Sequence, residues 1–206
     1  MNNILVELLQ SQLTGNNLST IGQQLNLGNQ NQTSSVTNSA VSLLLSALTR
    51  NSSSQNGLSL LVSALDRDHD GSIMDDIGSF LAGSNNFNNP RMVNGSGILS
   101  HLLGNNMGSV VEAFSRQNNL NSNQSRQLLT SLAPIILGAL TKSRQKAQVD
   151  QNGLYDLMKG ASTDFEPQNQ NQSQNILTNL LDQDGDGSIA DDVASFGKNI
   201  LGKLLK

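Results

Sequence analysis

The sequence predicts an all-α protein made of two related multihelical repeats, each ending in a helix–acidic loop–helix unit. Apolar residues recur at helical spacing along most of the chain, and no segment shows the strict alternation of a half-buried strand bounded by hairpin turns. Two nearly identical acidic loops occur, at residues 66–76 and 182–192. Several segments of the first half also recur in the second half. These observations together define the predicted architecture.

The acidic loops concentrate the chemistry of the chain. Each has aspartate at loop positions 1, 3 and 5, glycine at position 6 and isoleucine at position 8. This is the first half of an EF-hand loop, in which alternate oxygen ligands converge on a hard cation. Position 12 is Ile77 or Val193 instead of the usual glutamate, so a late aspartate must close each loop.

We therefore predict one calcium ion in each loop, with magnesium as the alternative ion. The predicted ligands share one pattern, which is four carboxylates and one backbone carbonyl in each loop. In the first loop they are Asp66, Asp68, Asp70 and Asp76 with the carbonyl of Ser72; in the second they are Asp182, Asp184, Asp186 and Asp192 with the carbonyl of Ser188. Asp75 and Asp191 are the second choice for closing each loop.

An alternative interpretation treats the loops as helix caps. Ser72 and Ser188 would be N-caps, and the late aspartate pairs would lie in the first helical turn, where the helix dipole favours them. This explains the late pairs but leaves three crowded aspartates upstream in both copies. The loops hold ten of the sixteen acidic residues and carry net charges of −4 and −5, so the rest of the chain is +5.

Leucine-rich stripes predict the helices of the first repeat, residues 1–82. We expect a helix that ends near Gly15, a second that Gly28 ends, and a longer third helix over 36–50. Residues 29–35 are expected to be polar linker and 51–57 a turn. A helix then leads into the acidic loop 66–76, and another follows it to about Leu81.

The pattern begins again after a linker predicted at 83–97. Residues 3–9, 21–27, 43–50 and 56–58 match 97–103, 114–120, 135–142 and 152–154, at offsets of 94, 93, 92 and 96. Nearly constant offsets indicate an internal duplication. The second repeat, 98–206, carries a polar insert at 162–174, the acidic loop 182–192 and a last helix over about 188–205. Pro134 is expected to break its long helix, because proline lacks the amide donor.

The chain resembles the YidB-like family of uncharacterised bacterial proteins, a domain of unknown function. The resemblance rests on residues 95–104, 132–140 and 181–189, in that order and spacing. It implies an all-α fold with internal repetition. It implies no catalytic residue, because the family has no established activity.

Several functional classes find no support in the sequence. There is no cysteine, and the two histidines, His69 and His101, lack the neighbours of a catalytic triad. No phosphate-binding glycine motif occurs, and the basic residues are scattered without interleaved aromatics, so we expect no nucleic-acid partner. The start of the chain lacks the basic region of a secretory signal, and no apolar stretch is long enough to span a bilayer. We expect a cytoplasmic protein without a membrane partner.

The sequence thus predicts a non-enzymatic helical protein in which two bound cations fix the angles between helices. The alternative is a metal-free scaffold, with an unknown protein partner or with self-association, whose acidic loops are only caps. A metal-dependent hydrolase is the third hypothesis. It would need a second catalytic group that the sequence does not supply.

Overall fold

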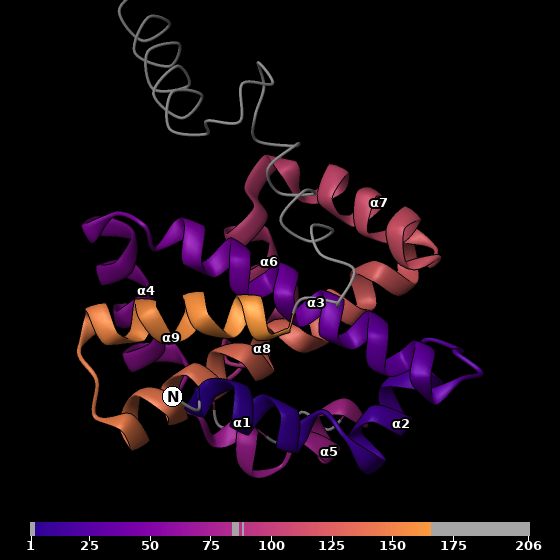
Figure 1. The fold of residues 1–206 in the computed structure, drawn as a ribbon, viewed down its shortest axis with the longest axis horizontal. Coiled ribbons are helices and arrows are strands. Elements are labelled where there is room, and N and C mark those ends of the chain that lie inside the picture. Colours follow the sequence, from indigo (N-terminus) through magenta and orange to yellow (C-terminus); the bar gives the residue numbers. More distant parts are fainter. Residues whose placement is uncertain (1–2, 84–86, 88, 166–206) are drawn as a thin grey trace, which may run out of the picture.

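The computed structural model describes residues 3–83, 87 and 89–165, and every regular element within these residues is a helix (Figure 1). This confirms the all-α prediction for the described part of the chain. The α-helices are α1 (Ile4–Gln12), α2 (Gly15–Gln24), α3 (Gln30–Asn51), α4 (Gln55–Asp68), α5 (Ile77–Leu81), α6 (Gly95–Leu103), α7 (Met107–Asn118), α8 (Ser122–Ala147) and α9 (Gln151–Asp164). Two short 3₁₀ helices, η1 (Ser72–Asp75) and η2 (Gly104–Asn106), complete the described elements.

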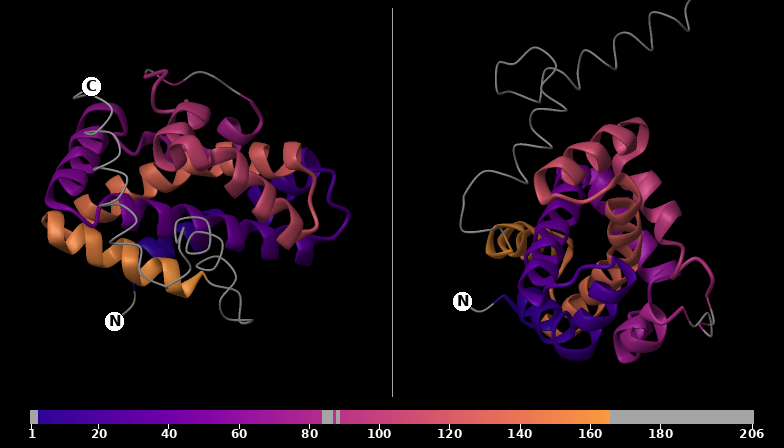
Figure 2. Two further views of the ribbon diagram at one scale, coloured as in Figure 1. Left: turned by 90° about the horizontal axis from the view of Figure 1, so that it is seen from above. Right: turned by 90° about the vertical axis from the view of Figure 1, so that its right-hand side faces the viewer.

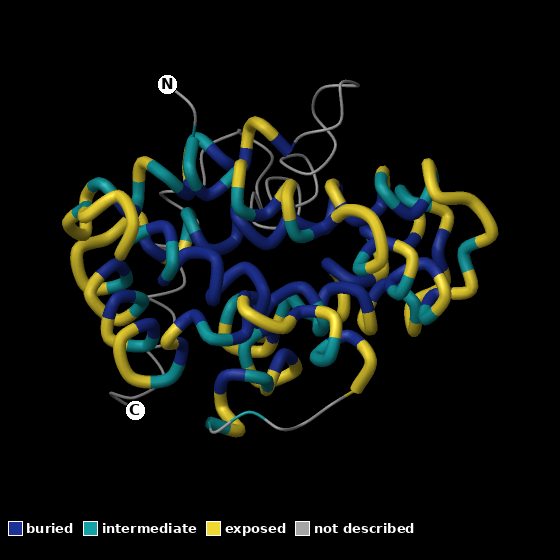
Figure 3. Tube along the Cα trace, turned by 90° about the horizontal axis from the view of Figure 1, so that it is seen from below, coloured by how far each residue is buried: buried dark blue, intermediate teal, exposed yellow. Residues whose placement is uncertain are grey.

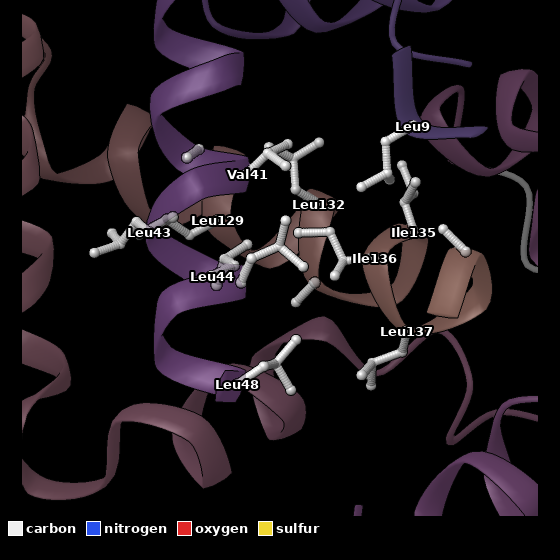
Figure 4. Close-up of a cluster of buried hydrophobic side chains, with 14 of the residues drawn as sticks. Leu9, Val41, Leu43, Leu44, Leu48, Leu129, Leu132, Ile135, Ile136 and Leu137 are labelled. Carbon is white, nitrogen blue, oxygen red and sulfur yellow. The ribbon is translucent and has the colours of Figure 1, made fainter. Parts of the chain in front are cut away.

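The long helices α3 and α8 pack against each other at the centre of the molecule. Residues 39–45 of α3 and 132–141 of α8 are buried without interruption, as expected of helices that are apolar on all sides. Figure 4 shows Val41, Leu44 and Leu48 of α3 beside Leu132 and Ile136 of α8. Figure 3 shows the same buried stretch running through the middle of the described chain.

The shorter helices surround this pair. Helices α6 and α7 lie on one side, and α1, α2 and α5 lie on the opposite side (Figures 1 and 2). Helix α9 packs along α3, and α4 packs against both α8 and α9. The largest buried side chains are aliphatic apart from Phe114, and they form one cluster with members from both predicted repeats.

The predicted break at Pro134 is wrong, because α8 continues through it from Ser122 to Ala147. Proline has no amide hydrogen, so the Thr130 carbonyl four residues earlier loses its usual donor. The backbone of α6 lies directly over that carbonyl. A Cβ atom added to Gly95 would overlap the Thr130 oxygen. Pro134 is itself buried, and the helix continues where sequence rules predict an interruption.

The predicted polar linker at 29–35 is also wrong, because α3 begins at Gln30. Asn29 caps the helix, its side-chain oxygen accepting the Asn31 N–H at 2.8 Å. Thr33 is buried, and its hydroxyl donates to the Asn29 carbonyl at 3.1 Å. Its side chain packs so closely on Gly22 that a Cβ there would lie 2.9 Å from the Thr33 hydroxyl oxygen. The polar residues thus satisfy their hydrogen bonds locally, and the helix begins at Gln30 instead of residue 36.

The segments that match in the sequence fall on described helices, and the two-repeat arrangement itself stays a prediction. The matched segments lie in or at the ends of α1 and α6, α2 and α7, α3 and α8, and α4 and α9. Helix α6 starts at Gly95, inside the predicted linker 83–97, and α9 extends to Asp164, inside the predicted insert 162–174. The remainder of that insert from residue 166 and the last predicted helix lie outside the described residues.

Candidate functional site: the first acidic loop

The first acidic loop begins on helical backbone. Leu58, Val62 and Leu65 are buried along α4, and the helix continues through Asp68 before the His69 N–H closes it on the Leu65 carbonyl at 3.1 Å. Asp66 and Asp68 are two residues apart on this helix, so their side chains leave it about 200° apart. They therefore diverge, whereas an EF-hand requires loop positions 1 and 3 to converge.

Two aspartates of the loop reach across to α8. The Asp66 carboxylate accepts from Arg144 at 2.6 Å, and the Asp75 carboxylate accepts from Lys142 at 3.0 Å. Both carboxylates are more than half exposed. Exposed pairs of this kind contribute about 0.2–1 kcal/mol each. These ion pairs therefore determine the position of the loop along α8 but add little to the stability of its contact with that helix.

The Asp68 carboxylate faces two arginine side chains instead. It forms a close ion pair with Arg67 at 2.7 Å and a longer one with Arg91 at 3.6 Å. Hydrogen bonding from Arg67, with the charges of Arg67 and Arg91, lowers the pKa of the Asp68 carboxyl, although its partial desolvation opposes this. The Asn89 side chain also donates to the Asp68 carbonyl at 3.2 Å, so the segment before α6 packs on this end of α4.

The middle of the loop is a tight turn. Asp70 accepts hydrogen bonds from the Ser72 hydroxyl at 2.6 Å and from the Ser72 N–H at 2.8 Å, which lowers the pKa of the Asp70 carboxyl. Gly71 between them has φ +86°, which favours glycine. A Cβ there would lie 3.0 Å from the Lys142 side chain and 3.3 Å from the Gly138 carbonyl. The loop thus packs directly on the backbone of α8.

Apolar contacts seat the loop on α8. Ile73 and Ile77 are almost wholly buried, and Met74 is buried beside them. Ile73 occupies a notch at Gly138, since a Cβ on Gly138 would overlap the Ile73 methyl carbon. The buried Thr141 hydroxyl donates to the His69 carbonyl at 2.6 Å. Burial of an isoleucine stabilises by about 1.5–3 kcal/mol, so these residues outweigh the two ion pairs.

The helix cap after the loop is Asp76, which corrects the alternative interpretation, in which Ser72 is an N-cap. The Asp76 carboxylate accepts the Ser79 N–H at 3.1 Å at the start of α5. Hydrogen bonds from Ser79 lower the pKa of the Asp76 carboxyl. Ser72 instead turns back to Asp70. Asp75 lies at the end of η1. Of the two late aspartates, Asp75 therefore forms an ion pair and Asp76 caps a helix.

His69 is the residue that the sequence analysis missed. The residue is 4% exposed, and its Nδ1 has no hydrogen-bond partner among the described residues. Burial lowers the pKa of the imidazole, and the nearby charges of Asp68 and Asp70 oppose this shift. His69 continues the buried stripe of Leu58, Val62 and Leu65, four residues beyond the last. That spacing could have indicated from the sequence that His69 is buried.

The predicted calcium ligands of this loop therefore have separate protein partners. Asp66 pairs with α8, Asp68 with Arg67 and Arg91, Asp70 with Ser72, and Asp76 with Ser79. In the part of the chain that the structure describes, no three acidic or histidine side chains are grouped so that they could hold a metal ion. The second predicted ligand set, Asp182, Asp184, Asp186, Ser188, Asp191 and Asp192, lies outside the described residues.

Within the described residues, the fold is helical throughout and the first acidic loop packs on the central helix α8. Residues 7–143 match the model of a family described as "Bacterial protein of unknown function (DUF937)". This match covers more than half of the chain, so the chain belongs to that family, consistent with its resemblance to the YidB-like proteins. No curated protein and no solved structure matches the chain. Across the described helices, none combines the length and apolarity needed to cross a membrane.

Proposed function

We propose that this protein is a non-enzymatic helical scaffold in which the first acidic loop fastens α4 and α5 to α8. The observation that carries the proposal is that all five aspartates of the loop have protein partners, three in ion pairs and two in turns or caps. The charged side chains of the loop surround the buried apolar residues that pack on α8. Its role is to define the angle at which the chain turns from α4 into α5.

A second candidate function is cation binding, and the repeated Asp-Xaa-Asp-Xaa-Asp-Gly pattern supports it. Calcium at the first loop would require the last turn of α4 to unwind, since Asp66 and Asp68 diverge on that helix. It would also displace the ion pairs with Arg144 and Arg91. The second loop contains no basic residue, whereas the first contains Arg67. We propose the second loop as the stronger calcium candidate.

Calorimetric titration of the chelator-stripped full chain with calcium, and with magnesium as control, separates these functions. The variants are Asp66→Asn with Asp68→Asn in the first loop, and Asp182→Asn with Asp184→Asn in the second. The scaffold proposal expects the first pair of substitutions to leave the calcium stoichiometry unchanged. Loss of one bound calcium in that variant would contradict it. Loss of calcium binding only in the second variant would support the cation site at 182–192.

A further inference from the structure

Three neighbouring residues of α8 bind the first acidic loop. Gly138 and Thr141 are buried there. Gly138 leaves the notch for Ile73, and the Thr141 hydroxyl donates to a carbonyl of the loop. Lys142 supplies a cation, which pairs with Asp75 at 3.0 Å. A small residue, a threonine and a basic residue at this spacing therefore form a binding face for an acidic loop of this sequence.

Helix α3 carries the same combination of residues at the same spacing. Residues 43–50 of α3 match 135–142 of α8 in sequence, and the three corresponding positions are Ser46, Thr49 and Arg50. All three are partly exposed, although the two residues between Ser46 and Thr49 are buried. The Thr49 hydroxyl donates to the carbonyl four residues earlier, as its counterpart on α8 does. This face of α3 thus resembles the loop-binding face of α8 but is covered less completely.

A second acidic loop of nearly the same sequence follows later in the chain, at residues 182–192, and lies outside the described residues. It has Ile189 and Asp191 at the loop positions that Ile73 and Asp75 occupy in the first loop. Its five aspartates and lack of a basic residue give it a net charge of −5, whereas the charged residue of α3 is the basic Arg50. Opposite charge therefore favours this loop as the occupant of the α3 face.

The segment that leads to the second loop begins beside this face and is long enough to return to it. The described chain ends at the buried Phe165, and the Ser162 carbonyl just before it accepts from the Ser42 hydroxyl at 3.0 Å. Ser46 lies one turn further along α3, about 6 Å away. Residues 166–181 can span up to about 50 Å. The loop can therefore reach the face without any change in the described helices.

We propose that the second acidic loop docks on this face of α3 within the same chain. Asp191 pairs with Arg50. Ile189 packs over Ser46. The inference rests on the proposed role of the first loop as a fastener between helices and extends that role to the second loop. It assigns the C-terminal part of the chain an attachment point on the central helix pair.

Two differences between the faces make the second contact weaker than the first. Ser46 has a Cβ atom at the position of Gly138, where a Cβ would overlap the isoleucine of the first loop. Ile189 therefore lies farther from its helix. The residue of α3 that matches Arg144 is Ser52, so one ion pair replaces two. Because salt screens exposed charges, the second contact should be lost at a lower ionic strength than the first.

Disulfide trapping in the full chain tests this contact, because the chain has no cysteine of its own. In chelator, Ser46→Cys combined with Ile189→Cys should form an intramolecular disulfide on mild oxidation, and peptide mapping by mass spectrometry measures the linked fraction. The negative control is Gly108→Cys with Ile189→Cys, since Gly108 is exposed on α7. Equal linking at both positions, or disulfide-linked dimers, would overturn the proposal.

The positive control separates this proposal from the proposed function. Gly138→Cys with Ile73→Cys places two Cβ atoms 3.8 Å apart, the usual separation in a disulfide. Failure of this pair to link would contradict docking of the first loop and with it the fastener role. If this pair links and the pair at Ser46 does not, only the inference about the second loop is wrong.

Charge reversal gives a second readout that needs only one cysteine. Iodoacetamide should label the thiol of Ser46→Cys slowly in the otherwise unchanged chain and several-fold faster when Asp191→Lys is added. Arg50→Asp in that background should restore slow labelling. A labelling rate that ignores Asp191→Lys would refute the contact. Protection that appears only when calcium is added would also refute it and would instead support the cation site at 182–192.

Discussion

The notch at Gly138 gives a prediction whose sign depends on where the first acidic loop lies. Gly138→Ala places a methyl group where the Ile73 side chain now packs, and 3.4 Å from a side-chain carbon of Met74. Overpacking of this kind costs about 1–3 kcal/mol, while replacement of a helical glycine by alanine gains up to about 1 kcal/mol. Because the overlap is with a buried branched side chain, we expect a net loss of about 1 kcal/mol in the free energy of unfolding.

Gly108→Ala is the matched control. Gly108 is also a glycine in a helix, but it is exposed and a Cβ there meets nothing within 4 Å. It should gain up to about 1 kcal/mol. Urea unfolding of both variants, followed by circular dichroism, measures the difference.

A double-mutant cycle with Ile73→Ala sharpens the test. Ile73→Ala alone should cost about 2–5 kcal/mol through lost burial and a cavity. In that background the alanine at position 138 fills vacated space, so Gly138→Ala should become neutral or stabilising. A coupling of at least about 0.5 kcal/mol is expected for residues in contact. If Gly138→Ala stabilises the wild type as much as Gly108→Ala does, Ile73 does not occupy the notch and the reasoning fails.

Three further predictions follow from the same structure. Asp76→Ala should lower the free energy of unfolding by about 1 kcal/mol through loss of the α5 cap, and Asp76→Asn should cost less. Urea midpoints at pH 7 measure both losses, and equal losses would contradict the cap. The pKa of His69 is lowered in the folded state, so the free energy of unfolding should fall as pH drops below the unfolded pKa of 6.5. His69→Gln should flatten this dependence of stability on pH between pH 7 and pH 5. An unchanged dependence would exclude His69 as its source. Gly95→Ala should cost about 1–3 kcal/mol in thermal unfolding because its Cβ overlaps the Thr130 carbonyl. A variant as stable as wild type would mean that α6 does not lie against the Thr130 carbonyl.

Apolar periodicity was sufficient to predict that the described chain is helical. Along α4 the buried Leu58, Val62 and Leu65 follow the predicted stripe, whereas residues 132–141 of α8 are buried on all sides and show no stripe. The failures at 29–35 and at Pro134 share one feature, which is a glycine of another helix close to the misjudged segment: Gly22 lies against Thr33, and Gly95 lies against the Thr130 carbonyl. At 29–35 the Asn29 cap and the Thr33 hydroxyl also satisfy hydrogen bonds locally. The contact of Gly95 with Thr130 joins residues distant in sequence and leaves no local pattern.

The candidate site was predictable in location but not in its contacts. The sequence places five aspartates within 66–76, yet the partners of Asp66 and Asp75 are Arg144 and Lys142, about 70 residues later. The continuation of α4 through Asp68 decides which way the carboxylates point, and helix ends are set by tertiary packing as much as by caps. The calcium ligands of both loops therefore stay predictions, with the second set beyond the described residues.

The stability of Asp66→Asn combined with Asp75→Asn, measured in the presence of a chelator, tests the central claim most directly. The exposed Asp156→Asn on α9 is the control, because it removes a carboxylate charge away from the loop. If the loop is a fastener between helices, the double variant loses about 1 kcal/mol without any metal, since two exposed ion pairs are removed. A double variant as stable as wild type in chelator, but lacking a calcium-dependent gain that wild type shows, would contradict the account and make the loop a cation site.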